Sequence, residues 1–236
     1  MSKIKAVLFD LDGTLLPLDQ DAFTKAYLGG LVAAAIAAGY DKYAVSTGIM
    51  AGVSAMLDNK SGLTNEEVFW LTLKEKVGED IAENRYLFDS FYESDFQKIK
   101  SLSWENSKSA DLLAAARERG LYVALATNPV FPSVATESRI RWAGLDPDDF
   151  DLVTTYENSH YCKPTHDYYR EVAHSLGVLP EECLMVGNDI SDDMPAGEIG
   201  MYVFLLTDCL INRKNEDISK YPSGGFDDLI NYLKKI

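Results

Sequence analysis

Short runs of consecutive apolar residues recur in this chain, and most are separated by longer stretches with helical periodicity. The apolar runs cover residues 4–9, 121–126, 150–154, 184–186 and 201–206. Strands that are apolar along their whole length are buried on both faces, which is typical of a parallel sheet covered by helices. The pattern therefore predicts an α/β fold with a doubly wound parallel sheet.

Helical periodicity fills the gaps between several of these runs. Stretches over 109–119, 133–143 and 164–176 are each followed by a glycine, which is a common signal for the end of a helix. A last helix is expected over 226–235, after a polar loop at 211–225. In a doubly wound sheet, ligands bind beyond the carboxyl ends of the strands, so the residues that follow each run are the candidates for chemistry.

The pattern changes between residues 17 and 100, where no strand-like run appears. Helical stretches are expected over 23–38, 46–57, 66–77 and 84–100, and Thr64 with Glu67 resembles a capping box before the third. We therefore predict a helical domain over 17–100, inserted into an α/β core domain formed by 1–16 and 101–236.

The composition excludes several classes of protein. Apolar residues make up 47% of the 236 positions, which is enough to fill a large core, and 22 basic against 37 acidic residues give a net charge of −15. Such a charge disfavours nucleic acid and anionic membrane as partners. No signal-peptide pattern or membrane-length apolar stretch occurs, and the three cysteines have neither a disulfide-framework nor a zinc-site spacing. We expect a soluble, cytoplasmic protein.

Acidic residues follow the first predicted strand. Asp10 and Asp12 are separated by one residue and precede Gly13, which permits a sharp turn and close approach of backbone N–H groups to an anion. Two neighbouring carboxylates repel each other unless a cation or protons compensate, and Mg²⁺ favours oxygen ligands of this kind. Taken alone, the segment is better interpreted as a strand followed by an ordinary Asp-Gly turn.

Three further segments follow the same logic. Thr127 and Asn128 follow the second strand and offer donors for phosphate oxygens, although both types also suit a helix cap. Lys163 precedes a predicted helix and offers a positive charge, although most lysines are solvated. The run from Asn188 through Asp189 to Asp193 forms a second acidic cluster, which also fits an acidic first turn of a helix.

In order along the chain, VLFDLDGT, VALATN, CKP and MVGNDISDD resemble the motifs of the haloacid dehalogenase-like (HAD) hydrolase superfamily. The resemblance covers residues 1–16 and 100–236. It implies a Rossmann-like core, and the helical insert matches in type the cap that this superfamily carries after the first motif.

The resemblance also implies roles for individual residues. Asp10 would attack phosphorus to form an aspartyl-phosphate, and Asp12 would serve as general acid and then general base. The phosphoryl oxygens would be held by Thr127, Asn128, Lys163 and the backbone N–H groups near Leu11 and Asp12.

Magnesium is the cofactor that the resemblance implies. Its ligands would be the Asp10 carboxylate, the Asp12 carbonyl and an acidic residue of the last motif. Many members have Gly-Asp there, whereas this chain has Gly187-Asn188 followed by Asp189. Asp189 is favoured as the ligand because of its charge, with Asn188 as the alternative, and Asp193 is expected in the outer shell.

The function implied is a Mg²⁺-dependent phosphatase that hydrolyses a small phosphorylated metabolite. A dehalogenase is disfavoured because it generally lacks an Asp at position 12. A phosphomutase of the same superfamily remains an alternative, and a phospho-accepting receiver-like module is a more distant one. The sequence does not identify the substrate, and it leaves monomer and homodimer equally open.

Overall fold

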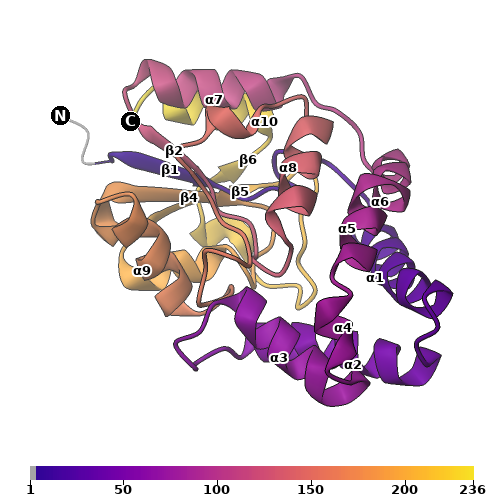
Figure 1. Cartoon of the computed structure of the whole chain (residues 1–236). Helices are drawn as coiled ribbons and strands as arrows, with labels where there is room; N and C mark the ends of the chain where they lie inside the picture. The colour runs from indigo at the N-terminus through magenta and orange to yellow at the C-terminus, as the bar shows by residue number, and fades with distance from the viewer. Residues whose placement is uncertain (1–3) are drawn as a thin grey trace.

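The computed structural model describes residues 4–236, so residues 1–3 of the predicted core segment lie outside the described part. Within it, six strands form one parallel sheet in the order β3-β2-β1-β4-β5-β6, with helices on both sides (Figure 1). The strands are β1 (Ala6–Phe9), β2 (Tyr122–Leu125), β3 (Leu152–Val153), β4 (Cys183–Gly187), β5 (Tyr202–Leu206) and β6 (Ser223–Gly224). The predicted doubly wound α/β fold is confirmed.

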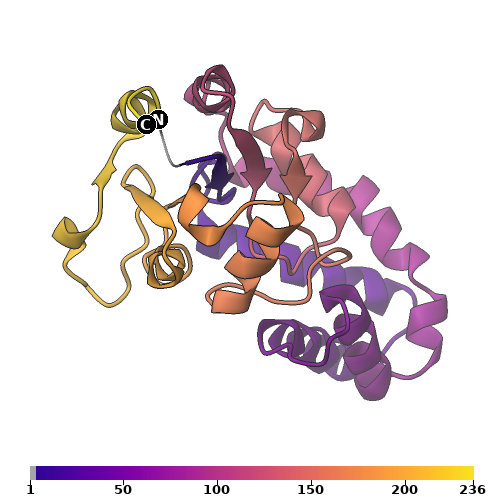
Figure 2. The same cartoon turned by 90° about the vertical axis from the view of Figure 1, so that its left-hand side faces the viewer.

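Alternate residues of the central strand β1 face the two layers of helices. Val7 and Phe9 belong to a hydrophobic cluster with residues of α7 and α10, whereas Ala6 and Leu8 belong to a second cluster with residues of α9. Figures 1 and 2 show these helices on opposite sides of the sheet. The covering helices are α7 (Lys108–Glu118), α9 (His166–Ser175) and α10 (Phe226–Leu233). Coverage by helices on both faces explains why β1 and β4 are buried along their whole length and β1 is apolar throughout.

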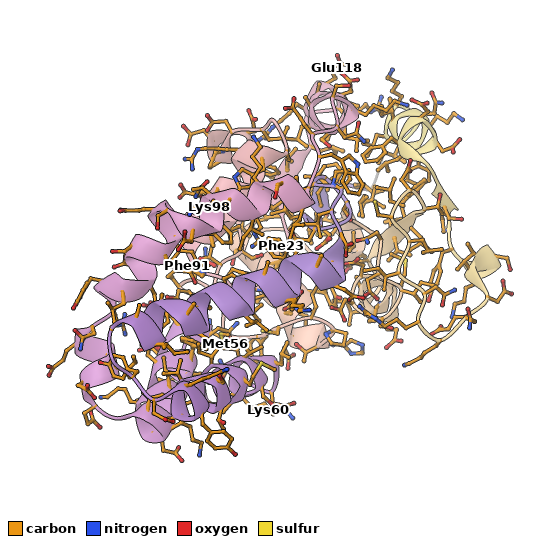
Figure 3. The ribbon with its side chains drawn as sticks, turned by 90° about the vertical axis from the view of Figure 1, so that its right-hand side faces the viewer. Phe23, Met56, Lys60, Phe91, Lys98 and Glu118 are labelled. Carbon is orange, nitrogen blue, oxygen red and sulfur yellow. The ribbon has the colours of Figure 1, made fainter. Side chains whose placement is uncertain are left out.

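The predicted insert is helical, and its helices gather at the end of the sheet toward which the strands run (Figure 1). Figure 3 shows the long helix α1 between α2 on one side and α5 with α6 on the other. The bounds are α1 (Gln20–Ala37), α2 (Lys42–Leu57), α3 (Asn65–Val77), α4 (Asp80–Glu83), α5 (Tyr86–Glu93), α6 (Asp95–Lys98) and the 3₁₀ turn η1 (Ile99–Leu102).

The prediction of one continuous helix over residues 84–100 is wrong. Residues 84–100 were expected to form a single helix, but α5 ends at Glu93 and α6 begins at Asp95. At the break, Ser94 has φ −122° and ψ −83°, and its hydroxyl donates to the Ser90 carbonyl at 2.6 Å. A serine hydroxyl that bonds to a backbone carbonyl competes with the helical hydrogen bonds, which accounts for the interruption.

Two other local features bear on the sequence reading. The Thr64–Glu67 capping box at the start of α3 is confirmed. By contrast, the prediction of a loop over 211–225 missed the short strand β6. Its residues, Ser223 and Gly224, carry no apolar pattern that would indicate a strand. None of the helices described between residues 4 and 236 has the length and apolarity that crossing a bilayer requires.

Candidate active site

Asp10 begins the loop that follows β1, and Gly13 gives this loop its shape. Gly13 has φ +86°, a left-handed conformation that side chains disfavour. A Cβ at this position would also lie 2.3 Å from Nδ2 of Asn188, which follows β4. The missing side chain therefore lets the loops after β1 and β4 approach each other directly.

Lys163 joins the two acidic clusters that the sequence placed far apart. Its Nζ donates to Asp10 Oδ1 at 2.9 Å and to Asp193 Oδ1 at 2.6 Å, and all three residues are buried. Burial alone would lower the pKa of Lys163, but Asp10 and Asp193 outweigh it and hold the pKa well above its usual range. The lysine is therefore charged and fixed by two carboxylates.

Asp12 has a separate partner, Arg139 of α8 (Ser133–Trp142). The guanidinium Nη1 donates to Asp12 Oδ2, and the Arg139 side chain is completely buried. Its Cζ lies 4.0 Å from the ring centroid of Phe131, a cation–π arrangement. Burial raises the pKa of the Asp12 carboxyl to about 6, and the charge of Arg139 opposes this rise. Asp12 Oδ1 is buried with no hydrogen-bond partner in the described part of the chain.

The loop after β4 holds Asp193 and Asp189 in different ways. Asp193 Oδ2 accepts from the Asp189 N–H at 2.9 Å, and a Cβ on Gly187 would lie 2.1 Å from the Asp193 carboxyl group. Asp189 Oδ1 accepts from the backbone N–H of Ser191 at 2.7 Å, and its Oδ2 lies 3.4 Å from Arg213. The Asp189 carboxylate thus caps its own turn.

Asn188 points toward the loop after β1. Its Nδ2 donates to the Cys209 carbonyl at 2.7 Å, which fixes the orientation of the amide. Its Oδ1 accepts from the Thr14 hydroxyl at 3.0 Å, and the same hydroxyl lies 3.2 Å from Asp10 Oδ2. Because the Thr14 hydroxyl carries one proton, Asp10 Oδ2 and Asn188 Oδ1 share a single donor. Both oxygens therefore keep lone pairs that could accept a further bond.

A cavity of about 210 Å³ brings the predicted site residues together. Thr127 follows β2, and its backbone carbonyl accepts from the hydroxyls of Thr154 at 2.7 Å and Tyr168 at 2.8 Å. Asn128 Oδ1 is buried without a partner among residues 4–236. Apart from Leu11, which is buried and offers only its backbone, every predicted site residue lines this cavity: Asp10, Asp12, Thr127, Asn128, Lys163, Asn188, Asp189 and Asp193.

The oxygens around Asp10 suit a hard cation. Asp10 Oδ2 and Asn188 Oδ1 share one hydroxyl proton, so both have lone pairs to offer, and Mg²⁺ prefers such oxygen donors. Within the described residues, no group of three or more His, Cys, Asp or Glu side chains is arranged to hold a metal ion.

Two contributors were not identified from the sequence. Thr14 belongs to the first motif, but the sequence analysis assigned it no role. In the structure its hydroxyl lies between Asp10 and Asn188 and can bond to either. Arg139 was read only as part of the helix over 133–143. Its position in the helix could have indicated burial, because Arg139 shares a helical face with the buried residues Ala135 and Trp142. A charged side chain that is buried needs a partner.

Comparison with known proteins identifies relatives of this chain. The family model of the haloacid dehalogenase-like hydrolases matches residues 4–199. The chain is 30% identical over 212 residues to the phosphoglycolate phosphatase of Vibrio cholerae, covering 88% of this chain and 86% of that protein. It is 32% identical over 89 residues to YhcW of Bacillus subtilis, a match that spans 38% of this chain and only 39% of that protein.

The fold has solved counterparts as well. The crystal structure of a predicted phosphoglycolate phosphatase from Haemophilus somnus 129PT superposes with a TM-score of 0.60 at 18% identity, covering 98% of this chain and 99% of that one. At this identity the likeness concerns the fold alone, whereas the family model and the Vibrio relative rest on sequence. The chain belongs to the haloacid dehalogenase-like hydrolases and is a hydrolytic enzyme.

Proposed function

We propose that this enzyme is a Mg²⁺-dependent phosphatase that hydrolyses a small phosphomonoester through an aspartyl-phosphate on Asp10. The observation that carries the proposal is that Asp10 and Asp12 line one cavity but are held by different buried cations, Lys163 and Arg139. Two carboxylates in distinct surroundings suit two distinct tasks. The phosphatase among the relatives supports the same reading.

In the first half-reaction, the Asp10 carboxylate attacks phosphorus and the bond from phosphorus to the leaving oxygen breaks. Asp12 donates a proton to that oxygen, so the product leaves as an alcohol. In the second, water attacks phosphorus, Asp12 takes its proton, and the bond to Asp10 breaks to release phosphate. A halide leaving group needs no proton, so an acid at position 12 favours phosphate esters over haloacids.

The phosphoryl oxygens would be held by residues around Asp10. Lys163 supplies a fixed positive charge, Thr127 and Asn128 line the cavity at the end of β2, and the N–H groups of Leu11 and Asp12 follow Asp10 in the loop. Such preformed donors stabilise the charge of the transferred group without reorganising. We further propose that α1–α6, predicted as an inserted domain, act as a cap over this cavity.

We propose Mg²⁺ as the cofactor, held by the Asp10 carboxylate, the Asp12 carbonyl and the Asn188 amide oxygen. When bound, the ion neutralises negative charge on the transferred phosphoryl group. Asn188 is chosen over Asp189 because its oxygen shares the Thr14 hydroxyl with Asp10, whereas the Asp189 carboxylate caps its own turn. The charge-based preference for Asp189 is therefore set aside. Asp193, expected in the outer shell, would orient Lys163.

The direct test is hydrolysis of p-nitrophenyl phosphate by the purified chain. We expect release of inorganic phosphate that requires Mg²⁺ and stops when the metal is chelated, with no halide release from 2-haloacids under the same conditions. Transfer of phosphate to a second sugar phosphate would indicate a phosphomutase instead. A stable phosphorylated protein without turnover would indicate a receiver-like module, and inactivity toward every phosphomonoester would contradict the proposal.

The metal ligand can be tested with two neighbouring variants. Asn188→Ala should raise the Mg²⁺ concentration needed for half-maximal activity by about tenfold or more, because it removes a ligand oxygen. Asp189→Ala should raise it much less, because its carboxylate bonds to backbone N–H groups and Arg213. Initial rates measured across a Mg²⁺ titration give both values. The reverse order would assign the ligand to Asp189.

A further inference from the structure

A second cavity, of about 330 Å³, lies beside the one that contains Asp10. Tyr27 and Val53 of the helical region and Val130 of the loop after β2 line both cavities, so the two meet at these residues. A group attached to a phosphate at Asp10 can extend past them into the second space. A cavity of about 150 Å³ suffices for a benzene molecule, so this one has room for a substituted ring.

Aromatic rings line much of the second cavity. Trp70 and Phe88 line it with their ring centroids 5.5 Å apart, and Phe69 meets Trp70 edge-on at 5.6 Å. All three residues are buried. Aromatic walls held in place by one another favour a flat or apolar partner, because ring–ring contacts add to the gain from burying apolar surface.

The indole of Trp70 also offers a polar contact. Its Nε1 is buried, and the Tyr156 side chain lies beside it. Burial raises the pKa of the Tyr156 hydroxyl, and a hydrogen bond from the Trp70 indole to that hydroxyl opposes this rise, so the two polar groups face each other.

The charges of the second cavity disfavour an anion. Among its described lining residues, the carboxylates of Glu66, Asp89 and Glu157 stand against the single guanidinium of Arg85. Arg85 is already paired with Glu66 at 2.8 Å and lies over the Trp70 ring with its Cζ 4.3 Å from the centroid. The described lining therefore carries a net negative charge, and its one cation is already paired with one of the carboxylates.

We propose that this second cavity binds the alcohol part of the substrate and selects an uncharged, ring-bearing alcohol over a small anionic one such as glycolate. The inference rests on the proposed phosphatase function, since it takes the phosphate to lie at Asp10. It adds the class of substrate, which the motifs around Asp10 do not specify.

Phosphonates test this binding without turnover, because their P–C bond resists hydrolysis. Three matched compounds are 3-phenylpropylphosphonate, butylphosphonate and 3-phosphonopropionate, titrated calorimetrically into the full chain with Mg²⁺. We expect the phenyl compound to bind at least about tenfold more tightly than either of the others. Equal affinities, tighter binding of the carboxylate compound, or no binding of the phenyl compound would each overturn the proposal.

A variant pair locates the effect. Val53→Phe places a larger side chain where the cavities meet and should remove most of the phenyl preference, measured as the ratio of affinities for the phenyl and butyl compounds. Ser54→Phe, at the next, exposed position of α2, should keep that ratio. A phenyl preference that survives Val53→Phe unchanged would place the ring elsewhere and overturn the assignment to this cavity.

The two proposals fail in different ways. A chain that prefers the phenyl phosphonate but hydrolyses no phosphomonoester contradicts the phosphatase function and leaves the cavity's preference standing. A chain that hydrolyses phosphomonoesters with Mg²⁺ yet binds 3-phosphonopropionate at least as tightly keeps the phosphatase function and loses the selectivity for rings.

Discussion

Asp10→Asn should reduce phosphatase activity by about 10³-fold or more, because an amide cannot replace the carboxylate as the nucleophile. The substitution changes shape little, and Lys163 keeps its contact with Asp193 at 2.6 Å, so the buried amine is not left unpaired. Steady-state rates with p-nitrophenyl phosphate and Mg²⁺ measure the loss.

A control separates this effect from a general loss of acidic charge or of folding. Asp111→Asn removes an exposed carboxylate from α7, on the sheet face away from α9, and should leave the rate close to that of the natural chain. Thermal unfolding of the Asp10→Asn chain should remain cooperative. Should Mg²⁺-dependent turnover persist in a folded Asp10→Asn chain at more than a few per cent, Asp10 would not be the nucleophile.

The sequence predicted the sheet because its central strands are buried on both faces and so consist of apolar runs. Val7, Ala124 and Leu184 sit in such strands, and all are completely buried. The prediction failed where local pattern does not decide structure. β6 consists of Ser223 and Gly224, which join the sheet by backbone pairing with β5, and backbone pairing leaves no apolar signature.

The site was predictable to the extent that it depends on short motifs. Asp10, Asp12 and Lys163 were singled out because the ordered motifs resemble those of the haloacid dehalogenase-like hydrolases, and the structure brings the three residues to one cavity. The choice between Asn188 and Asp189 depends on which side chain the backbone engages. Charge alone favours Asp189, whereas the hydrogen bonds that its carboxylate accepts from the N–H groups of its own turn become visible only in the structure.

Arg139 shows the second limit of sequence reasoning. It lies 127 positions from Asp12, and only the packing of α8 against the loop after β1 brings the two together. Helical spacing indicates that Arg139 faces inward, but it does not identify the carboxylate that receives it. The sequence can therefore indicate that a charged side chain is buried, but only the structure identifies a partner that lies far along the chain.

The ion pair between Arg139 and Asp12 should have a large effect on the stability of the fold. Arg139→Met should lower the free energy of unfolding by about 3–5 kcal/mol, because it leaves the Asp12 carboxylate buried without its cation. Arg141→Met is the matched control. This arginine lies on the same helix with an exposed side chain and a surface pair to Glu137, so its loss should cost no more than about 0.5 kcal/mol. Urea unfolding without metal measures both.

A double variant shows whether the cost arises from the charge of Asp12 or from lost packing. If charge dominates, adding Asp12→Asn to Arg139→Met should recover at least about 1 kcal/mol, since a neutral amide needs no cation. If the lost contact with Phe131 dominates, the two substitutions should add independently or worsen together. Recovery would assign Arg139 the task of holding the Asp12 carboxylate in a buried site where it could not otherwise remain ionised, and additive losses would refute that role.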